Sequence, residues 1–99
     1  MACTDEAVYQ SLALNKQGAF SLYPNPNSGK FNVEYTGQEG QVTCEIRDMI
    51  GNLVYSKSYY LYPFDVIEIG SDFWLSNGIY SFTINGSQTR NTCAYVVHR

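Results

Sequence analysis

Short segments in which apolar and polar residues alternate recur along this chain, and they restrict it to a β-sheet fold. In the segment 30–35, Phe31, Val33 and Tyr35 alternate with polar neighbours. Such alternation is typical of a half-buried strand, because successive side chains of a strand point to opposite faces of the sheet. Turn signals separate the segments at the spacing of about 8–12 residues that all-β domains show. The pattern predicts seven strands, over residues 19–23, 30–35, 42–47, 53–60, 66–69, 79–85 and 88–98.

Two pairs of these segments are expected to form hairpins. Gly51, which is suited to positive φ, lies in the tight connection after residue 47. The pair Asn85-Gly86 is a strong hairpin signal before the last strand. We therefore expect an all-β fold, a seven-stranded antiparallel immunoglobulin-like β-sandwich, with a small barrel as the alternative. The phase of the last strand stays open, because both Cys93/Tyr95/Val97 and Ala94/Val96 are apolar.

Length and charge narrow the function classes. The 99 residues suffice for one domain with a modest core. The net charge is −3 and the six basic residues are scattered, whereas a nucleic-acid binder should show a clustered basic face. The chain is therefore not expected to bind nucleic acid.

The first residues differ from the rest of the chain. Residues 1–18 show little alternation, and we interpret them as a tail or linker in front of a domain over residues 19–99. The acidic start lacks the apolar stretch of a secretory leader. No apolar run approaches the ~20 residues that would span a bilayer.

A proline-rich segment precedes the first strongly alternating strand. Tyr23 is followed by Pro24, Asn25 and Pro26, and the segment ends at Gly29. Proline fixes φ near −65° and favours extended geometry in the residue before it. The segment is therefore predicted to be a rigid extended arm that turns at residues 27–29.

The three cysteines give no metal signature. They are widely spaced and include no Cys-x-x-Cys pair, so no zinc site and no cofactor are expected. Cys44 and Cys93 fall inside predicted strands, where buried free thiols would act as small apolar residues. The alternative is a Cys44–Cys93 disulfide, which would stabilise the fold by about 2–4 kcal/mol.

No pattern of catalytic residues emerges. The single histidine, His98, is the penultimate residue, which argues against a Ser/His/acid arrangement or a metal site. Asp48 is expected to organise the turn before Gly51 through its side-chain oxygens. We therefore expect a protein that is not an enzyme.

Four tyrosines cluster within residues 55–62 and allow two interpretations. They could line the core with their hydroxyls at its edge, or they could form an exposed platform for sugars or a protein partner. At least one of Tyr59 and Tyr60 should face outward, because neighbours in a strand alternate. The platform would fit a cell-surface adhesion or carbohydrate-binding module.

Four sequence blocks follow one another from Phe20 to Arg99. They are Phe20-Ser21-Leu22-Tyr23-Pro24-Asn25-Pro26 with Gly29, Ile46 to Val54, Leu75 to Phe82, and Ala94-Tyr95-Val96-Val97 with His98-Arg99. In this order and spacing, they resemble the C-terminal sorting domains of the bacterial type IX secretion system. The resemblance covers roughly four-fifths of the chain.

The resemblance implies an immunoglobulin-like sandwich at the end of a secreted cargo protein of Bacteroidota. The implied partners are the outer-membrane translocon, a sortase complex and the N-terminally fused cargo. The sortase would cut before Phe20, often joining the cargo to a surface lipopolysaccharide. The implied location is the periplasm in transit to the outer membrane, the cell surface or the medium.

The resemblance also implies where recognition is concentrated, namely in residues 78–99. Members often carry lysines before the final strand, where this chain has Arg90. An exposed last strand could pair at its edge with a receptor, or with a second copy to give a dimer. The residues expected to carry the signal are Tyr23, Pro24, Asn25, Pro26, Gly29, Asp48, Gly51, Gly78, Tyr80, Arg90, Tyr95, Val96, Val97 and Arg99.

Overall fold

The computed structural model describes residues 20–87 and 90–99, and it contains seven strands. The expected tail at residues 1–18 and the cleavage position before Phe20 lie outside these residues. Each strand matches a predicted segment, with its ends shifted by at most two residues. The strands are β1 (Phe20–Tyr23), β2 (Phe31–Tyr35), β3 (Gly40–Arg47), β4 (Leu53–Leu61), β5 (Val66–Ile69), β6 (Gly78–Asn85) and β7 (Arg90–Val97).

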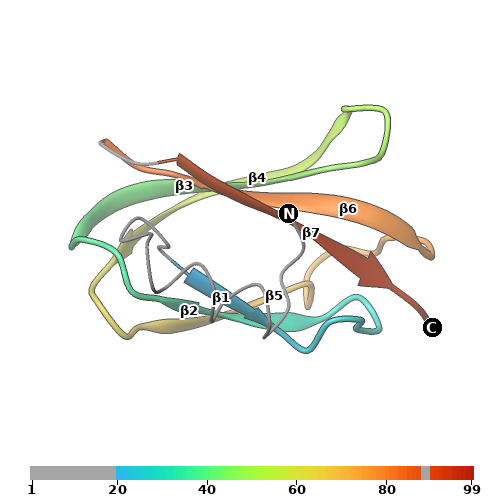
Figure 1. The fold of residues 1–99 in the computed structure, drawn as a ribbon, viewed down its shortest axis with the longest axis horizontal. Helices are drawn as coiled ribbons and strands as arrows, with labels where there is room; N and C mark the ends of the chain where they lie inside the picture. The colour runs from blue at the N-terminus through green and yellow to red at the C-terminus, as the bar shows by residue number, and fades with distance from the viewer. Residues whose placement is uncertain (1–19, 88–89) are drawn as a thin grey trace.

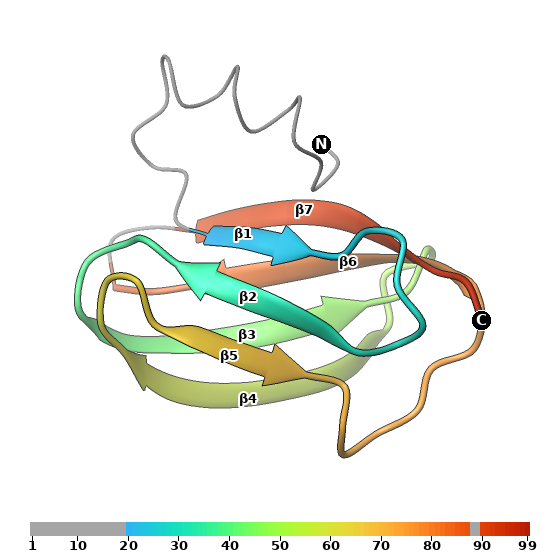
Figure 2. The ribbon, with the colours of Figure 1, turned by 90° about the horizontal axis from the view of Figure 1, so that it is seen from below.

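The strands form two antiparallel sheets packed face to face. One sheet has the order β1-β2-β5 and the other has the order β4-β3-β6-β7. Figure 1 and Figure 2 show β1, β2 and β5 lying across the larger sheet. Both predicted hairpins are confirmed, since β3 pairs with β4 and β6 pairs with β7. Within the described residues, no helix is long and apolar enough to cross a membrane.

The core fills the space between the sheets, and the alternating positions supply it. Phe31, Val33 and Tyr35 of β2 are all buried, as their phase predicted. Phe82 of β6 lies at the centre, with its ring edge-to-face against Phe20 at 5.3 Å and Phe31 at 5.6 Å between centroids. Edge-to-face pairs stabilise beyond the area they bury. The aromatic residues therefore join the two sheets.

The structure settles the phase of β7. Cys93, Tyr95 and Val97 are buried in the core, whereas Val96 is partly exposed on the other face. Tyr95 packs its ring on Phe31 at 4.8 Å and on Tyr80 at 5.9 Å. The last strand thus contributes its bulkiest residue to the core.

The alternative of a Cys44–Cys93 disulfide was wrong. Cys44 is a free, fully buried thiol, and burial raises its pKa to about 12. Cys93 is disulfide-bonded, so the interpretation as a buried free thiol is confirmed for Cys44 and is wrong for Cys93. Strand β6 lies between the strands that carry these two cysteines. Residues two strands apart are separated by about 9–10 Å, beyond the ~7 Å that a disulfide can bridge between Cα atoms.

The tyrosine cluster divides between core and surface. Tyr55 is half-buried and stacks on Phe73, with 4.4 Å between ring centroids. Tyr60 is exposed, which confirms that one of the two adjacent tyrosines faces outward. Its hydroxyl donates to Glu39 Oε2 at 2.9 Å, and its ring meets Tyr62 edge-on. Only part of the cluster is therefore available to a partner.

Removal of one buried hydroxyl is expected to cost nothing. The Tyr95 hydroxyl is buried and has no hydrogen-bond partner among the described residues. Since an unsatisfied buried hydroxyl is destabilising, Tyr95→Phe should leave stability unchanged or raise it by about 1 kcal/mol. Tyr80→Phe is the matched control, because the Tyr80 hydroxyl donates to Ser76 O at 2.7 Å. It should lose about 1 kcal/mol in urea unfolding. Equal losses in both variants would contradict the prediction.

Candidate functional site

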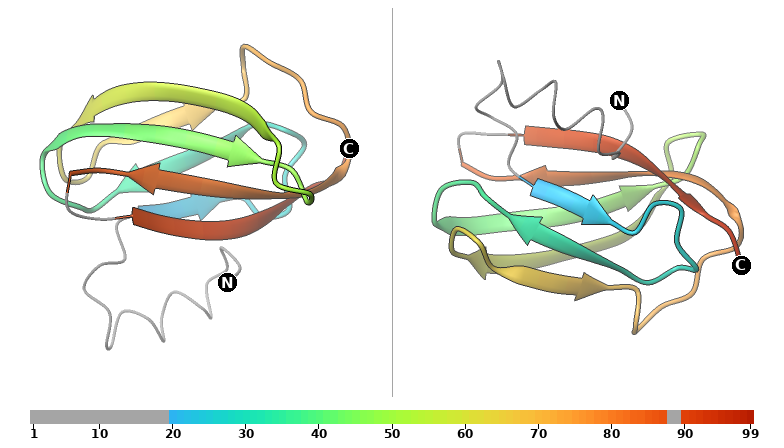
Figure 3. Two further views of the ribbon diagram at one scale, coloured as in Figure 1. Left: turned by 90° about the horizontal axis from the view of Figure 1, so that it is seen from above. Right: turned by 60° about the horizontal axis from the view of Figure 1, so that its bottom comes forward.

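The four sequence blocks meet at one end of the sandwich, which we call the C-terminal pole. It is formed by the segments 23–30, 48–52 and 70–77 together with residues 96–99. Figure 1 and Figure 3 show these loops at the end where the chain terminates. Antiparallel order explains the convergence, because β1, β3, β5 and β7 all end here. Blocks that are far apart in the sequence thus form one surface.

Asn27 joins the proline-rich segment to the last strand. It is 5% exposed, and it forms the isolated parallel bridge to Val97. Its N–H donates to Val96 O at 2.9 Å, and its carbonyl accepts from the N–H of His98 at 2.7 Å. Its side chain donates to Pro24 O at 3.1 Å and accepts from the Gly29 N–H at 2.9 Å. A buried amide with this many partners fixes the whole segment.

The prediction of a rigid extended arm was wrong. The segment bends through residues 24–26, where both X-Pro peptide bonds are cis. Asn25 Oδ1 accepts the N–H of Val96 at 3.0 Å, so the bent segment lies along the outer edge of β7. Rules about the residue before proline describe local φ and ψ, and they carry no information about hydrogen bonds to a strand about 70 residues away.

Two glycines let the loops of the pole touch. Gly29 and Gly70 have φ of +109° and +107°, which disfavours other residues. A side chain on Gly70 would collide with the backbone carbonyl of Gly29, and one on Gly29 would collide with the guanidinium of Arg99. The contact between the loops therefore requires glycine at position 70, whereas at position 29 the flexible Arg99 side chain can move and the positive φ is what favours glycine.

Arg99 closes the pole from the other side. Its Nε donates to Leu75 O at 3.0 Å, and its backbone N–H donates to Asn77 Oδ1 at 2.9 Å. The guanidinium carbon lies 4.5 Å from the ring centroid of Trp74. A cation over an indole face is attracted by the ring quadrupole. These contacts hold the last residue against the loop 70–77.

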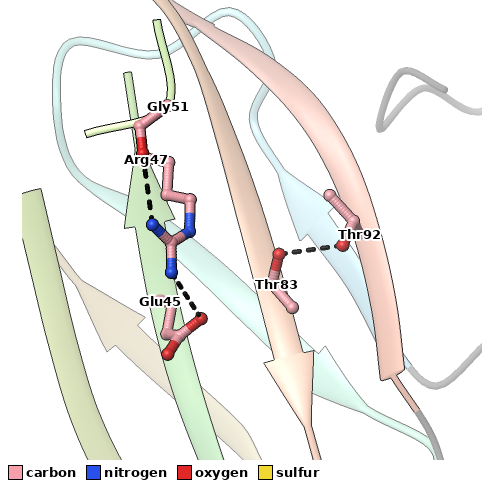
Figure 4. A network of polar contacts seen from close by, with 5 residues as sticks. All are labelled: Glu45, Arg47, Gly51, Thr83 and Thr92. Atoms are coloured by element: carbon pink, nitrogen blue, oxygen red, sulfur yellow. Dashed lines mark hydrogen bonds and ion pairs between the residues drawn. The ribbon is translucent and has the colours of Figure 1, made fainter. Parts of the chain in front are cut away.

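The hairpin between β3 and β4 is fixed by Asp48, as the sequence predicted. Asp48 Oδ1 accepts the N–H of Ile50 at 3.1 Å and of Asn52 at 2.9 Å, and Oδ2 accepts from Asn52 Nδ2. Figure 4 shows Arg47 on the outer face of the sheet, donating to Gly51 O at 3.2 Å and lying 3.7 Å from Glu45. Hydrogen bonds from Asn52 and Ile50 lower the pKa of Asp48.

The Asp48 contacts predict an acid-sensitive loop. The hydrogen bonds favour the carboxylate, so its contribution is present above the usual aspartate pKa of about 3.9 and is lost as pH falls through the lowered value. NMR titration of the Ile50 and Asn52 amides should therefore show a midpoint below about 3.9. Asp48→Asn should remove this transition. A midpoint above 3.9 would contradict the assignment.

Some expected signal residues lie away from this surface. Tyr80, Tyr95 and Val97 are buried and support the core, although Tyr80 also holds the loop 70–77 through Ser76. Arg90 begins β7 opposite Asn85, at the other end of the sandwich. On the outer face between the two ends, Thr83 and Thr92 share a hydrogen bond of 2.8 Å (Figure 4). The expected residues therefore divide among the pole, its supporting core and, for Arg90, the opposite end of the sandwich.

Sequence reasoning missed Asn27, Trp74 and Asn77. The sequence predicts only turns at Asn27 and Asn77, and a turn or a single helical turn at Trp74. The available signals were an asparagine directly after a proline and a single tryptophan shortly before the turn at residues 76–78. Neither signal identifies a partner, because all three contact segments distant in the sequence.

Three carboxylates of the described chain make structural contacts. Asp65 Oδ2 accepts the Tyr62 N–H at 2.8 Å, Glu39 accepts from Tyr60, and Asp48 holds its own loop. Residues 20–87 and 90–99 include no group of three or more His, Cys, Asp or Glu side chains that could hold a metal ion.

Comparison with protein families identifies the family to which the chain belongs. A family model for the secretion system C-terminal sorting domain matches residues 21–98, which include the whole pole except Arg99. The chain belongs to this family. No curated protein matches the chain. The sorting domain is the C-terminal signal for type IX secretion, and it marks its cargo for export to the outer membrane, the cell surface or the medium. Its partners therefore include the secretion machinery and a fused cargo.

Proposed function

We propose that the secretion machinery recognises the sorting domain at its C-terminal pole, and that the domain works without catalysis. The observation that carries this is the convergence of all four family-like blocks at one end, where Asn27 and Arg99 tie them together. A recognition surface built from loops on a rigid sandwich is a common arrangement. The two-sheet architecture also supports an immunoglobulin-like designation for the fold.

We further propose a route and a fate for the domain. It passes through the periplasm with its cargo, is engaged by the outer-membrane translocon, and is then removed by a sortase that cuts before Phe20. The support is the pole itself, which leaves the start of β1 at the opposite end of the sandwich. A sortase could thus reach the cut while the translocon holds the pole.

A fusion experiment tests the proposal. Residues 19–99 are joined to a fluorescent protein that carries a periplasmic leader, and the fusion is expressed in a type IX-competent host. Surface display or release is expected, and periplasmic retention would contradict the function. Arg99→Ala should reduce export, because it removes the contacts with Trp74 and Leu75. Tyr60→Ala, at the other end, should not. Equal export of both variants would exclude recognition at the pole.

The edge of β7 suggests how a receptor could pair with the domain. Val96 N–H and C=O point to the outer edge, where Asn25 and Asn27 bond them. Alternation in an antiparallel ladder directs the same groups of Ala94 and Thr92 to that edge. A receptor strand would therefore pair along residues 92–94. Proline at Val96 would break the link to Asn25 and is expected to stop export while the cargo still folds.

A dimer through an edge strand fits these observations less well. On β4, the other edge of the sheet, Lys57 is directly opposite Cys44 and so lies on the face that carries the core. Charged residues on the inward face of an edge strand oppose pairing with another strand. On β7, the proline-rich segment occupies the end of the edge at Val96, which leaves only the short stretch 92–94 for a partner strand of any kind. We therefore propose that the sorting domain acts as a single copy.

A further inference from the structure

Two large aliphatic side chains extend into solvent beside the C-terminal pole. Met49 and Ile50 form the tip of the hairpin between β3 and β4, and they are 74% and 82% exposed. Figure 1 shows this hairpin projecting from the sheet at the end where the chain terminates. Single exposed apolar residues are ordinary, but adjacent ones on a protruding loop mark a candidate contact site.

The loop that carries this tip is held in one conformation. The carboxylate of Asp48 binds the N–H groups of Ile50 and Asn52, and the Gly51 N–H donates to Asp48 O at 3.0 Å. Arg47 adds a hydrogen bond to Gly51 O. A loop that is already ordered loses less conformational entropy on binding. Insertion of the tip into a pocket of complementary shape would therefore cost little conformational entropy.

The tip continues into a shallow apolar hollow on the outer face of the sheet. The hollow has a volume of about 330 Å³ and lies between the loop and strands β6 and β7. Met49, Ile79 and Ala94 line it together with Arg47. Ile79 is itself partly exposed. A partner that grips the tip would therefore also cover neighbouring apolar surface.

Charge discriminates between a protein pocket and a lipid surface. Near the tip, the two negative charges of Glu45 and Asp48 outnumber the one positive charge of Arg47. The chain as a whole carries a net charge of −3. Anionic bilayers attract clusters of lysine and arginine, which this region lacks. The electrostatics thus favour an apolar pocket in a protein.

We propose that Met49 and Ile50 are an anchor that inserts into an apolar pocket of a protein of the export machinery. This inference rests on the proposed recognition at the pole, and it assigns the contact to a pair of side chains. Apolar anchors in a partner's pocket typically supply much of the binding energy of an interface. The anchor would act together with the pole, since both lie at the same end of the sandwich.

Export of the fluorescent fusion tests the anchor. The double variant Met49→Ser/Ile50→Ser is expected to reduce surface display or release by about tenfold or more. Phe64→Ser is the matched control, because Phe64 is 74% exposed in the loop between β4 and β5 at the opposite end. It should be exported normally. Both variants should keep the melting temperature of the unsubstituted domain, since they change exposed side chains.

The other possible outcomes distinguish a failure of the anchor from a failure of the proposed function. Normal export of the double variant would overturn the anchor and leave the proposed function intact, whereas retention of the unsubstituted fusion would overturn the function itself. A photo-crosslinker at position 50, but not at 64, should yield an adduct with a translocon protein, and this adduct should vanish in a translocon-deficient strain. Anchor-dependent binding to phosphatidylethanolamine–phosphatidylglycerol vesicles, or anchor-dependent dimerisation in light scattering, would overturn the protein pocket.

Discussion

Gly70→Ala is expected to destabilise the sorting domain by about 4 kcal/mol or more. The new methyl group would meet the carbonyl of Gly29, with Lys30 Cα also only 3.0 Å away, and neither backbone atom can move without disrupting the pole. The φ of +107° adds strain of about 1–2 kcal/mol. The melting temperature should fall by about 16 °C or more.

The variant Gly51→Ala serves as the control for Gly70→Ala, because it has the backbone strain of a positive φ without the steric collision. Gly51 also has a positive φ, of +96°, but a side chain there would meet no atom within 4 Å. It should therefore cost only the conformational strain of about 1–2 kcal/mol. Equal melting temperatures of the two variants would show that the contact between Gly29 and Gly70 is not tight. Calorimetry of the unsubstituted domain and of the two purified variants measures the three melting temperatures.

Phe82→Ala is expected to cost about 3–5 kcal/mol, the range for removal of a buried aromatic ring. The ring is fully buried and contacts Phe20 of one sheet edge and Phe31 at the centre of that sheet. Urea unfolding should show a lower midpoint. If the machinery recognises the folded pole, export of the fusion should decline in proportion to the unfolded fraction.

Phe64→Ala is the control for this substitution, since it removes the same ring from an exposed loop. Its effect should stay within about 0.5 kcal/mol. Normal export of a Phe82→Ala fusion that is shown to be unfolded would mean that the machinery recognises a linear sequence. The pair therefore tests whether the signal is a surface or a peptide.

The strands could be predicted because their signal is local. Whether Phe31 or Val33 is buried depends on a period of two residues, which the sequence displays directly. The turn at Asp48 was predictable for the same reason, since a carboxylate that bonds backbone groups a few residues ahead is a local motif. Family-like blocks also pointed to the segments that form the pole.

What the sequence could not supply is the order of strands in the sheets. The position of β6 between β3 and β7 separates Cys44 from Cys93, and no local pattern reveals it. The bent course of residues 24–26 depends on bonds from Asn25 and Asn27 to β7. The role of Trp74 depends on Arg99, whose guanidinium lies over the indole ring. Each of these features is a contact between distant segments.

The bond between Asn25 and Val96 spans 71 positions. Closing so long a loop costs chain entropy, so the contact becomes favourable only after the intervening strands have formed. The junction therefore exists only in a domain whose strands have already formed, and a receptor that binds it would bind the folded domain. If the machinery binds at this junction, domains that have not completed folding should not be bound.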